Sequence, residues 1–571
     1  MKKNHFFILF SWIGLSLFYM LPAVDLSNWH VALIRGDDYP FHFARIFGVM
    51  DQLKDTGQIQ SVARFGERDI FYGVNMFYPT LTTVLPIALL SLIFQSVIFG
   101  VYGYLFLMNL LTFYIAYQCA NYISSIALPE VNIRAKQFLP FVFSFFYVFS
   151  HYRLICFYQR FDLGEFFVLT MYPLIFAGFY SILKDGGTKK YWLIVGLSLT
   201  AYSHVLSLML VVVVLTGLFV VGFIKKMITM KVFKQLVFSA IMTMIISAGA
   251  LVPILYQMLT LHIRSVRVHD LASEATNIGV MIVSSSINYL SYISIGIILL
   301  CSLMLGIYHV IWKKESIVRK DKLLRLCLWL SLVITFMMTS VFPWRVLQHT
   351  PLAIIQFPFR LMPFLSVFGS FLGAAILADY FSRFATVSLK RVTIWLSVAM
   401  VIISTLSVNA LMIRRSLNKL MYDKQDIVAT KRYIKSVNRD YFPAGLTDEQ
   451  TKRIKDKIGQ VNQEDVPMPY QFEKNAAIIK VTLNEQTNTV DTPIIGYSGL
   501  VVEEDEKRIK TTLSSERTLS FQLPKGVHEL SIYYDPPFLI KYSAVFSGIV
   551  ALFYGVYVMK IKKETGLIPK S

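Results

Sequence analysis

Residues 191–223, YWLIVGLSLTAYSHVLSLMLVVVVLTGLFVVGF, contain no aspartate, glutamate, lysine or arginine. A helix needs about 20 apolar residues to cross roughly 30 Å of hydrocarbon, so this stretch is long enough for two crossings. Basic clusters flank it on both sides, 184-KDGGTKK-190 and 225-KKMITMK-231. Because lysine and arginine gather in the cytoplasmic loops of membrane proteins, both ends of this pair of helices are predicted to lie on the cytoplasmic side.

The rest of the chain follows the same pattern. Only 16% of its 571 residues are charged, whereas about a quarter are charged in a typical soluble protein. These features predict an all-α transmembrane bundle of about 12–14 helices, since the apolar runs are too long and uniform for barrel strands. The loop 23–79 is assigned to the outside, and Arg134 with Lys136 to the inside. Residues 80–122 must therefore cross an odd number of times, and three short crossings are favoured over one. The other runs are 6–24, 138–157, 165–183, 235–256, 289–312, 326–342, 361–381, 392–411 and 539–559.

The net charge of +20 is spread over short loops between apolar runs, such as 313-KKESIVRKDKLLR-325 and 560-KIKK-563. A nucleic-acid surface would collect these charges on one face of a soluble domain. Membrane lipids, and not nucleic acid, are therefore the expected partners. The basic start of the chain before 6–24 predicts an uncleaved first span, with both termini cytoplasmic.

The longest polar stretch, 412–538, separates a membrane domain over 1–411 from a final span at 539–559. Its first part, 412–473, is predicted to be an outer linker containing a helix over 447–461, with Thr447 as the N-cap. Residues 474–535 alternate β-branched, aromatic and polar side chains. They predict a small β-sandwich-like module on the outer side, with a turn at 524-PKG-526.

The loop 25–79, on the predicted outer side, contains 37-DDYPFHFAR-45. A helix starting near Pro40 would place His42 and Arg45 on one side, with Asp38 just before its first turn. A carboxylate can deprotonate a hydroxyl, a guanidinium can bind phosphate, and an imidazole can orient a substrate or bind metal. Asp38, Asp37 and His42 are thus candidate catalytic residues, with Asp38 and His42 as candidate metal ligands and Arg45 as a candidate substrate-binding residue. The alternative is a solvated loop helix.

Further candidates for substrate binding fall on the same predicted side, and each has a structural alternative. An aromatic residue before proline is also a common interfacial anchor, and a buried acidic residue near arginine can be a simple ion pair. A histidine between two spans can be a hydrogen-bonded structural residue, and an arginine at a span entry can reach toward lipid headgroups. The aromatic residue before proline is Tyr78, and the acidic residue near arginine is Glu165, close to Arg160. The histidine between two spans is His204, and the arginine at a span entry is Arg360.

The chain resembles the GT-C superfamily of polytopic membrane glycosyltransferases, and more narrowly the bacterial YfhO-like and related uncharacterised membrane proteins. The resemblance rests on short motifs spread over nearly the whole chain. They are GDDYPFHFARI at 36–46, YGVNMFYP at 72–79, RFDLGEF at 160–166, SHVLS at 203–207, QFPFR at 356–360, DYFPAG at 440–445 and LPKGVHELSIYY at 523–534.

The resemblance implies a sugar transfer with inversion from a polyprenyl-phosphate-linked donor to a cell-envelope acceptor, at the outer face of the bacterial cell membrane. It places the acidic residue that activates the acceptor hydroxyl at Asp38, with Asp37 beside it. Many members carry a DE or DxD pair where this chain has DD before an aromatic residue and proline, which leaves metal dependence open. Two other classes also stay open: a transporter of envelope lipids or polysaccharide, and a non-catalytic envelope assembly protein.

Overall fold

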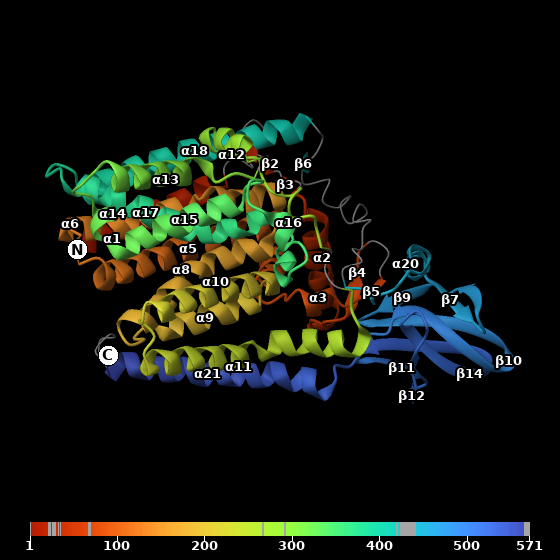
Figure 1. Cartoon of the computed structure of the whole chain (residues 1–571). Coiled ribbons are helices and arrows are strands. Elements are labelled where there is room, and N and C mark those ends of the chain that lie inside the picture. The colour runs from red at the N-terminus through yellow and green to blue at the C-terminus, as the bar shows by residue number, and fades with distance from the viewer. Residues whose placement is uncertain are drawn as a thin grey trace. The chain divides into compact units, whose positions relative to one another are not determined.

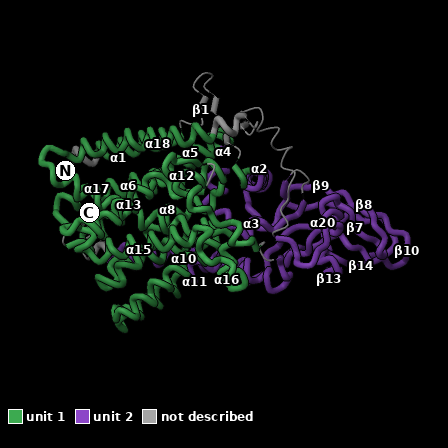
Figure 2. The backbone as a smooth tube through the Cα atoms, turned by 45° about the horizontal axis from the view of Figure 1, so that its top comes forward, with its two compact units in different colours: residues 1–39, 93–243, 268–426 green, residues 40–92, 244–267, 427–571 purple. Residues whose placement is uncertain are grey.

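The computed structural model describes residues 2–20, 24–25, 30–31, 33–34, 36–66, 70–129, 131–264, 268–290, 293–417, 421–422 and 441–564. It contains two compact units, coloured separately in Figure 2. Unit 1 comprises residues 1–39, 93–243 and 268–426, and unit 2 comprises residues 40–92, 244–267 and 427–571. Unit 2 therefore includes the last span and two segments, 40–92 and 244–267, that the sequence had assigned to the membrane domain.

Unit 1 is a helical bundle built around α6 (Ile133–Val148) and α17 (Met362–Ser382), which pack against each other (Figure 1). The long helix α5 (Val97–Ala127) and α8 (Leu163–Lys184) complete one side of this core. The helices α13 (Gly296–Ile311) and α15 (Lys322–Met337) cover α17 on the other. Apart from the first turn of α6, which carries Arg134 and Lys136, both central helices are largely apolar and buried, as expected for helices enclosed by other helices.

Peripheral helices of unit 1 leave apolar side chains exposed. Residues 191–223 form α9 (Lys190–Ala201) and α10 (Val205–Ile224), which confirms two helices, although only α10 is long enough to cross a membrane. Phe223 on α10 is 66% exposed. Soluble proteins rarely expose large continuous apolar surfaces, so this surface is compatible with a multi-pass membrane protein. The remaining helices here are α1 (Lys2–Phe18), α7 (His151–Leu154), η2 (Ile155–Arg160), α12 (Ile278–Ser286), α14 (Ile317–Lys320), α16 (Trp344–Leu347), η3 (Pro351–Ile355), η4 (Pro358–Leu361) and α18 (Leu389–Leu417).

Eight helices of the described residues are long and apolar enough to cross a membrane, fewer than the 12–14 expected. The difference arises because several apolar runs form short helices, such as α9 with 12 residues and α15 with 16. The eight are Val97–Ala127, Ile133–Arg160, Leu163–Lys184, Val205–Ile224, Met230–Leu261, Pro358–Ser382, Leu389–Leu411 and Phe538–Ile561. Shorter apolar helices are Phe6–Phe18, Val84–Ile93 and Gly296–Ile311.

The prediction of three short crossings in 80–122 is wrong. The segment contains the ten-residue helix α4 (Val84–Ile93) and then one unbroken helix, α5, with 31 residues. Ser96 caps α5 by accepting a hydrogen bond from the amide of Phe99, and no proline interrupts the helix afterwards. The apolar chain that seemed too long for one crossing is therefore a single extended helix.

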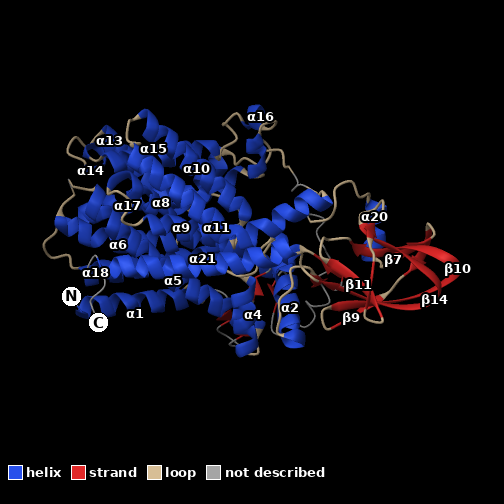
Figure 3. Cartoon of the chain, turned by 90° about the horizontal axis from the view of Figure 1, so that it is seen from below, coloured by secondary structure: helices blue, strands red, loops and turns tan. Residues whose placement is uncertain are grey.

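Unit 2 contains an eight-stranded antiparallel sheet with the order β12-β11-β14-β10-β7-β8, in which β13 also pairs with β14 and β9 with β10 (Figure 3). Its centre is the pair of long strands β10 (Ala476–Ile495) and β14 (Thr518–Tyr534). All eight strands belong to this one hydrogen-bonded sheet, so the β-rich module is confirmed as a sheet region. The other strands are β7 (Ile458–Val461), β8 (Glu464–Pro467), β9 (Tyr470–Glu473), β11 (Leu500–Glu504), β12 (Lys507–Ile509) and β13 (Thr512–Leu513).

Two local predictions in this module need correction. The turn expected at 524-PKG-526 is absent, because β14 continues through Pro524 and a register shift against 483–487 of β10 absorbs the irregularity. The helix expected over 447–461 is shorter. It is α20 (Asp448–Lys455), with a capping box between Thr447 and Gln450, and residues 458–461 form β7 instead.

The remaining elements of unit 2 are helices and a small hairpin. Ser547 on α21 accepts a hydrogen bond from the amide of Gly249 on α11 at 2.7 Å, which joins these two long helices.

Much of the predicted linker, 418–420 and 423–440, lies outside the described residues, as does Asp440 of the DYFPAG motif. The elements are α2 (Tyr39–Thr56), β4 (Ala63–Phe65), β5 (Ile70–Tyr72), α3 (Val74–Phe77), α4, α11 (Met230–Leu261) and α21 (Phe538–Glu564); α2 and α11 begin in unit 1. In unit 1, β1 (Val24–Asp25) pairs with β2 (His30–Val31), and β3 (Leu33–Ile34) pairs with β6 (Met421–Tyr422).

Candidate functional site

The local backbone over residues 155–165 brings several charged side chains of unit 1 together. Residues Ile155–Arg160 form a π-helix, and Phe161 then adopts a left-handed conformation with φ 56° and ψ 37°. Asp162 follows as the N-cap of α8, and its Oδ1 accepts the amide hydrogen of Glu165 at 3.0 Å. Single π-helical turns are rare in proteins overall, and those that occur are often found at functional sites. The sharp change of direction after Arg160 places Arg160, Asp162 and Glu165 around one point.

A second segment of unit 1 brings Asp38 to the same point. The amide of Asp37 donates to the carbonyl of Gln159 at 3.2 Å, and the amide of Asp38 donates to that of Arg160 at 2.8 Å. Gly36 permits this close approach, because a Cβ there would lie 2.7 Å from the carbonyl carbon of Arg160. The position of Asp38 is therefore fixed by backbone contacts with the end of the π-helix.

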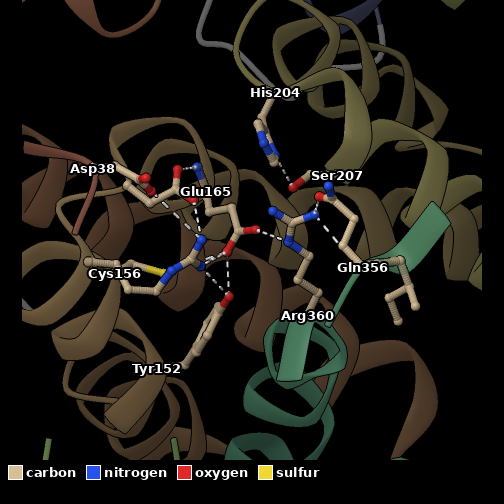
Figure 4. A network of polar contacts seen from close by, with 11 residues as sticks. Asp38, Tyr152, Cys156, Glu165, His204, Ser207, Gln356 and Arg360 are labelled. Carbon is tan, nitrogen blue, oxygen red and sulfur yellow. Dashed lines mark hydrogen bonds and ion pairs between the residues drawn. The ribbon is translucent and has the colours of Figure 1, made fainter. Parts of the chain in front are cut away.

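Arg160 lies at the centre of a cluster of carboxylates, of which Asp38 and Glu165 are labelled in Figure 4. Its Nη1 is 2.7 Å from Oε2 of Glu165, and its Nη2 is 2.9 Å from Oδ2 of Asp162. The same Nη2 is 3.9 Å from Oδ2 of Asp38, a much looser contact. Arg160, Asp162 and Glu165 are buried, whereas 45% of the Asp38 side chain is exposed. Asp38 is thus the least tightly paired and the most accessible carboxylate of the three.

Arg360 approaches the cluster from η4. Its Nε lies 3.2 Å from Oε1 of Glu165, and its Nη1 donates to Oε1 of Gln356 and to the carbonyl of Ile355. Its Nη2 takes part in no recorded hydrogen bond or ion pair with the described residues. Tyr152 completes the shell of Glu165 by donating its hydroxyl hydrogen to Oε2. Both oxygens of Glu165 are consequently occupied, while Arg360 retains donor capacity.

The electrostatic surroundings separate the two aspartates of this cluster. Removal from water, together with the negative charges of Asp162, Asp37 and Glu165, raises the pKa of Asp38 to about 7, although Arg160 opposes this shift. Burial also disfavours a charged Asp162, but Arg160 and the backbone hydrogen bond from Glu165 outweigh that effect and hold its pKa below the ordinary value. Asp38 can therefore gain or lose a proton near neutral pH, whereas Asp162 remains a carboxylate.

His204 precedes α10 and lies near the same carboxylates. Its Nδ1 is 2.7 Å from Oγ of Ser207, and burial lowers its pKa, so the ring is neutral at pH 7. A possible set of metal ligands consists of Asp162, Glu165 and His204. Each offers one donor atom, these atoms lie within 4.8 Å of one another, and together they could hold a divalent cation. Such a cation would compete with Arg160, whose guanidinium already neutralises both carboxylates. Here the donor set differs from the predicted ligands Asp38 and His42.

The predicted residues His42, Arg45 and Tyr78 belong to unit 2, where they form a group of their own. The predicted helix over this motif is confirmed as α2. Arg45 is fully buried, and its Nη2 donates to the carbonyls of Tyr78 and Pro79, while the guanidinium lies 4.5 Å from the Tyr78 ring centre. Arg45 thus ties α2 to the YGVNMFYP segment. The His42 ring packs edge-on against Tyr78 at 5.6 Å.

The structure brings Asp38, Arg160, Glu165, His204 and Arg360 into one region of unit 1, from segments up to 322 positions apart in the sequence (360 minus 38). Two structural alternatives are also realised, since Arg160 pairs with Glu165 and His204 hydrogen-bonds to Ser207. Three further residues hold the cluster together. They are Asp162, which is visible inside RFDLGEF, Gln356, four positions before Arg360, and Tyr152, for which no sequence signal stands out.

No protein-family model matches the chain, and no curated protein matches its sequence. A functional assignment therefore depends on the geometry of this cluster together with the motifs described above.

Proposed function

We propose that the protein is an integral membrane glycosyltransferase that transfers a sugar from a polyprenyl-phosphate-linked donor to a hydroxyl of a cell-envelope acceptor, with Asp38 as general base. The observation that carries the proposal is the unequal pairing within the charged cluster. Arg160 holds Asp162 and Glu165 at 2.9 and 2.7 Å but Asp38 only at 3.9 Å. This leaves one accessible carboxylate beside a tightly neutralised pair.

The pKa of Asp38 supports its role as a base. General bases are most effective when their pKa lies near the working pH, and that of Asp38 is raised to about 7. A purely structural ion-pair network would be expected to hold all of its carboxylates fully ionised. Asp38 departs from this pattern, because three carboxylates share two guanidinium groups and Asp38 has the weakest contact.

Arg360 supports the assignment of a phosphate-bearing substrate. Guanidinium groups bind phosphate oxygens through parallel hydrogen bonds, and the Nη2 group of Arg360 has no recorded partner among the described residues. The Nε of this guanidinium lies 3.2 Å from Oε1 of Glu165, so the ion pair keeps the guanidinium next to the carboxylate cluster. An anionic leaving group could therefore be stabilised without a large rearrangement of the side chain.

The proposed step is a single displacement. The carboxylate of Asp38 takes the proton of the acceptor hydroxyl as its oxygen forms a bond to the anomeric carbon of the sugar. The bond between that carbon and the lipid-phosphate oxygen breaks, and the phosphate leaves with the electron pair, facing Arg360. Attack opposite the leaving group inverts the anomeric configuration. The sugar and the polyprenyl lipid come from the GT-C resemblance, while acid–base and phosphate chemistry come from the cluster.

The test is a transfer assay on the purified full-length chain in lipid nanodiscs. It uses radiolabelled undecaprenyl-phosphate sugars and candidate envelope polymers, each with and without a chelator. Wild-type protein is expected to transfer label to one acceptor, and Asp38→Asn is expected to lose roughly 10²–10⁴-fold of the rate. Glu449→Gln is the matched control, because it removes an exposed carboxylate on α20 of unit 2 and should leave transfer unchanged.

Two results would count against the proposal. Equal transfer by Asp38→Asn and wild type would remove Asp38 as the base. Movement of intact labelled lipid across the bilayer without transfer, at the same rate in both proteins, would favour the transporter class instead.

A further inference from the structure

A second feature of unit 1 is an apolar groove that is separate from the charged cluster. It encloses about 260 Å³ and is walled by α5, α6, α8, α10, α15 and α17. The walls are almost wholly aliphatic and aromatic, with Phe176, Leu218, Leu326 and Phe371 among the lining side chains. Pockets for small ligands typically measure roughly 300–1,000 Å³, so this volume suits one hydrocarbon chain better than a bulky polar molecule.

Three lysines are the only charged residues that line this groove within the described part of the chain: Lys184, Lys225 and Lys322. They lie at the end of α8, directly after α10 and at the start of α15, respectively, and all three are exposed. None of the three takes part in an ion pair recorded for the described residues. The ends of three helices thus bring three lysine ammonium groups, none of them in an ion pair among the described residues, to the edge of one apolar groove.

The acidic residues next to these lysines are engaged elsewhere. Asp185 accepts hydrogen bonds from Tyr122, Ser181 and Thr188, and Asp321 caps α15 by accepting from the amides of Leu323 and Leu324. Neither carboxylate lines the groove. Among the described residues, no carboxylate therefore forms an ion pair with these lysines, and their ammonium groups remain open to an external anion.

We propose that this groove is a binding site for an anionic phospholipid, with one acyl chain between the helices and the headgroup phosphate at Lys184, Lys225 and Lys322. Charge complementarity and the apolar walls together define this occupant, since an amphiphile with one negative end satisfies both parts of the groove. The hydroxyl-bearing ring of Tyr180 also lines it, one helical turn before Lys184 on α8. These lysines fall in the clusters that the charge pattern assigns to the cytoplasmic side, so the lipid would come from that leaflet.

The site is tested by native mass spectrometry of the purified full-length chain, titrated with phosphatidylglycerol and, separately, with phosphatidylcholine of the same acyl chains. One phosphatidylglycerol is expected to bind more tightly than phosphatidylcholine. Each Lys→Gln change in the groove should weaken binding roughly five-fold, and the triple variant Lys184→Gln/Lys225→Gln/Lys322→Gln roughly 100-fold. These lysines are exposed, so their removal should leave the melting temperature in lipid-free detergent unchanged.

The matched control is the triple variant Lys313→Gln/Lys314→Gln/Lys390→Gln, which removes the same charge from positions outside the groove, two after α13 and one at the start of α18. It should keep wild-type affinity for phosphatidylglycerol. Equal affinity for the two lipids, or an equal loss in both triple variants, would overturn the proposal. Displacement of the lipid by millimolar inorganic phosphate would also overturn it, because it would show that the groove walls add nothing to binding. All of these outcomes are independent of sugar transfer.

Discussion

At the scale of single residues, Asp38 combines an accessible carboxylate with a raised pKa, and this combination has a measurable consequence for stability. In the unfolded chain an aspartate ionises near pH 4, whereas in the folded protein Asp38 ionises at about 7. Between these values the folded state holds a proton that the unfolded state releases. The contribution of Asp38 to the free energy of unfolding therefore falls as the pH rises from about 4 to about 7 and is constant above that.

Asp38→Asn is accordingly expected to stabilise the protein at neutral pH while it removes transfer. The gain in melting temperature over wild type should be absent near pH 4 and should grow until about pH 7. Thermal unfolding of both proteins across this range measures the difference. A gain that is the same at every pH, or a loss of stability at neutral pH, would show that Asp38 is ionised without cost and would contradict the raised pKa.

Glu165 has the opposite role, because it neutralises two buried guanidinium groups. Glu165→Gln would leave Arg160 and Arg360 with too few negative partners, and breaking a buried ion pair in this way costs about 3–5 kcal/mol. The matched control is Glu315→Gln, which breaks the exposed pair with Lys320 and should leave the melting temperature unchanged. Equal effects of the two substitutions on melting temperature would show that the Glu165 network contributes no more than a surface ion pair.

At the scale of elements, the contact between residues 36–38 and the end of the π-helix is what positions Asp38. Gly36→Ala would place a methyl group 2.7–2.8 Å from backbone atoms of Arg160, so one segment must move away. Transfer is expected to fall at least ten-fold, with retained binding of the lipid donor, because Arg360 is not displaced. Parallel measurements of transfer rate and donor affinity test this expectation.

The control for this prediction is Gly14→Ala in α1 of the same unit, where an added methyl group would meet no atom within 4 Å. It should leave transfer unchanged and leave stability unchanged or slightly raised, because alanine favours helix more than glycine does. If Gly36→Ala is as active as this control, the backbone contact does not position the base.

Some parts of the site can be predicted from the sequence, and others depend on how the helices pack. Asp38, Arg160, Glu165, His204 and Arg360 were identified because charged residues are rare next to apolar runs. Asp37, next to Asp38, contributes its amide to the positioning contact. The π-helix over Ile155–Arg160 and the left-handed Phe161 have no comparable signature, because they depend on packing within the bundle. The split between Asp38 in unit 1 and His42 in unit 2 was also hidden, because both lie in one nine-residue motif.

At the scale of the whole molecule, hydrophobic patterning predicted the helical bundle and the β-rich module but not the number of long helices. Hydropathy identifies apolar runs, yet it does not say whether a run such as 80–122 bends or continues as one helix. Only local features, such as the Ser96 cap and the absence of proline after it, decide between these outcomes. The strand through Pro524 was missed for a similar reason, since a register shift in the partner strand accommodates the proline.

Orientation in the membrane gives a prediction at this scale. The basic cluster 560-KIKK-563 follows the last candidate span, so the C-terminus is expected on the cytoplasmic side. Green fluorescent protein fused after the last residue should therefore fluoresce in cells, while alkaline phosphatase fused at the same point should be inactive. Active phosphatase and dark fluorescent protein would reverse this assignment of the C-terminus.

The central claim is that a half-exposed aspartate with a pKa near neutrality is the base for sugar transfer. The most direct measurement is the rate of a single transfer turnover by wild type and Asp38→Asn, followed from acidic to alkaline pH. The wild-type rate should rise as the pH passes through about 7 and then level off, as the base loses its proton, while Asp38→Asn should stay near background throughout. Wild-type rates in Asp38→Asn, or a wild-type rate that is highest where Asp38 is protonated, would contradict the claim.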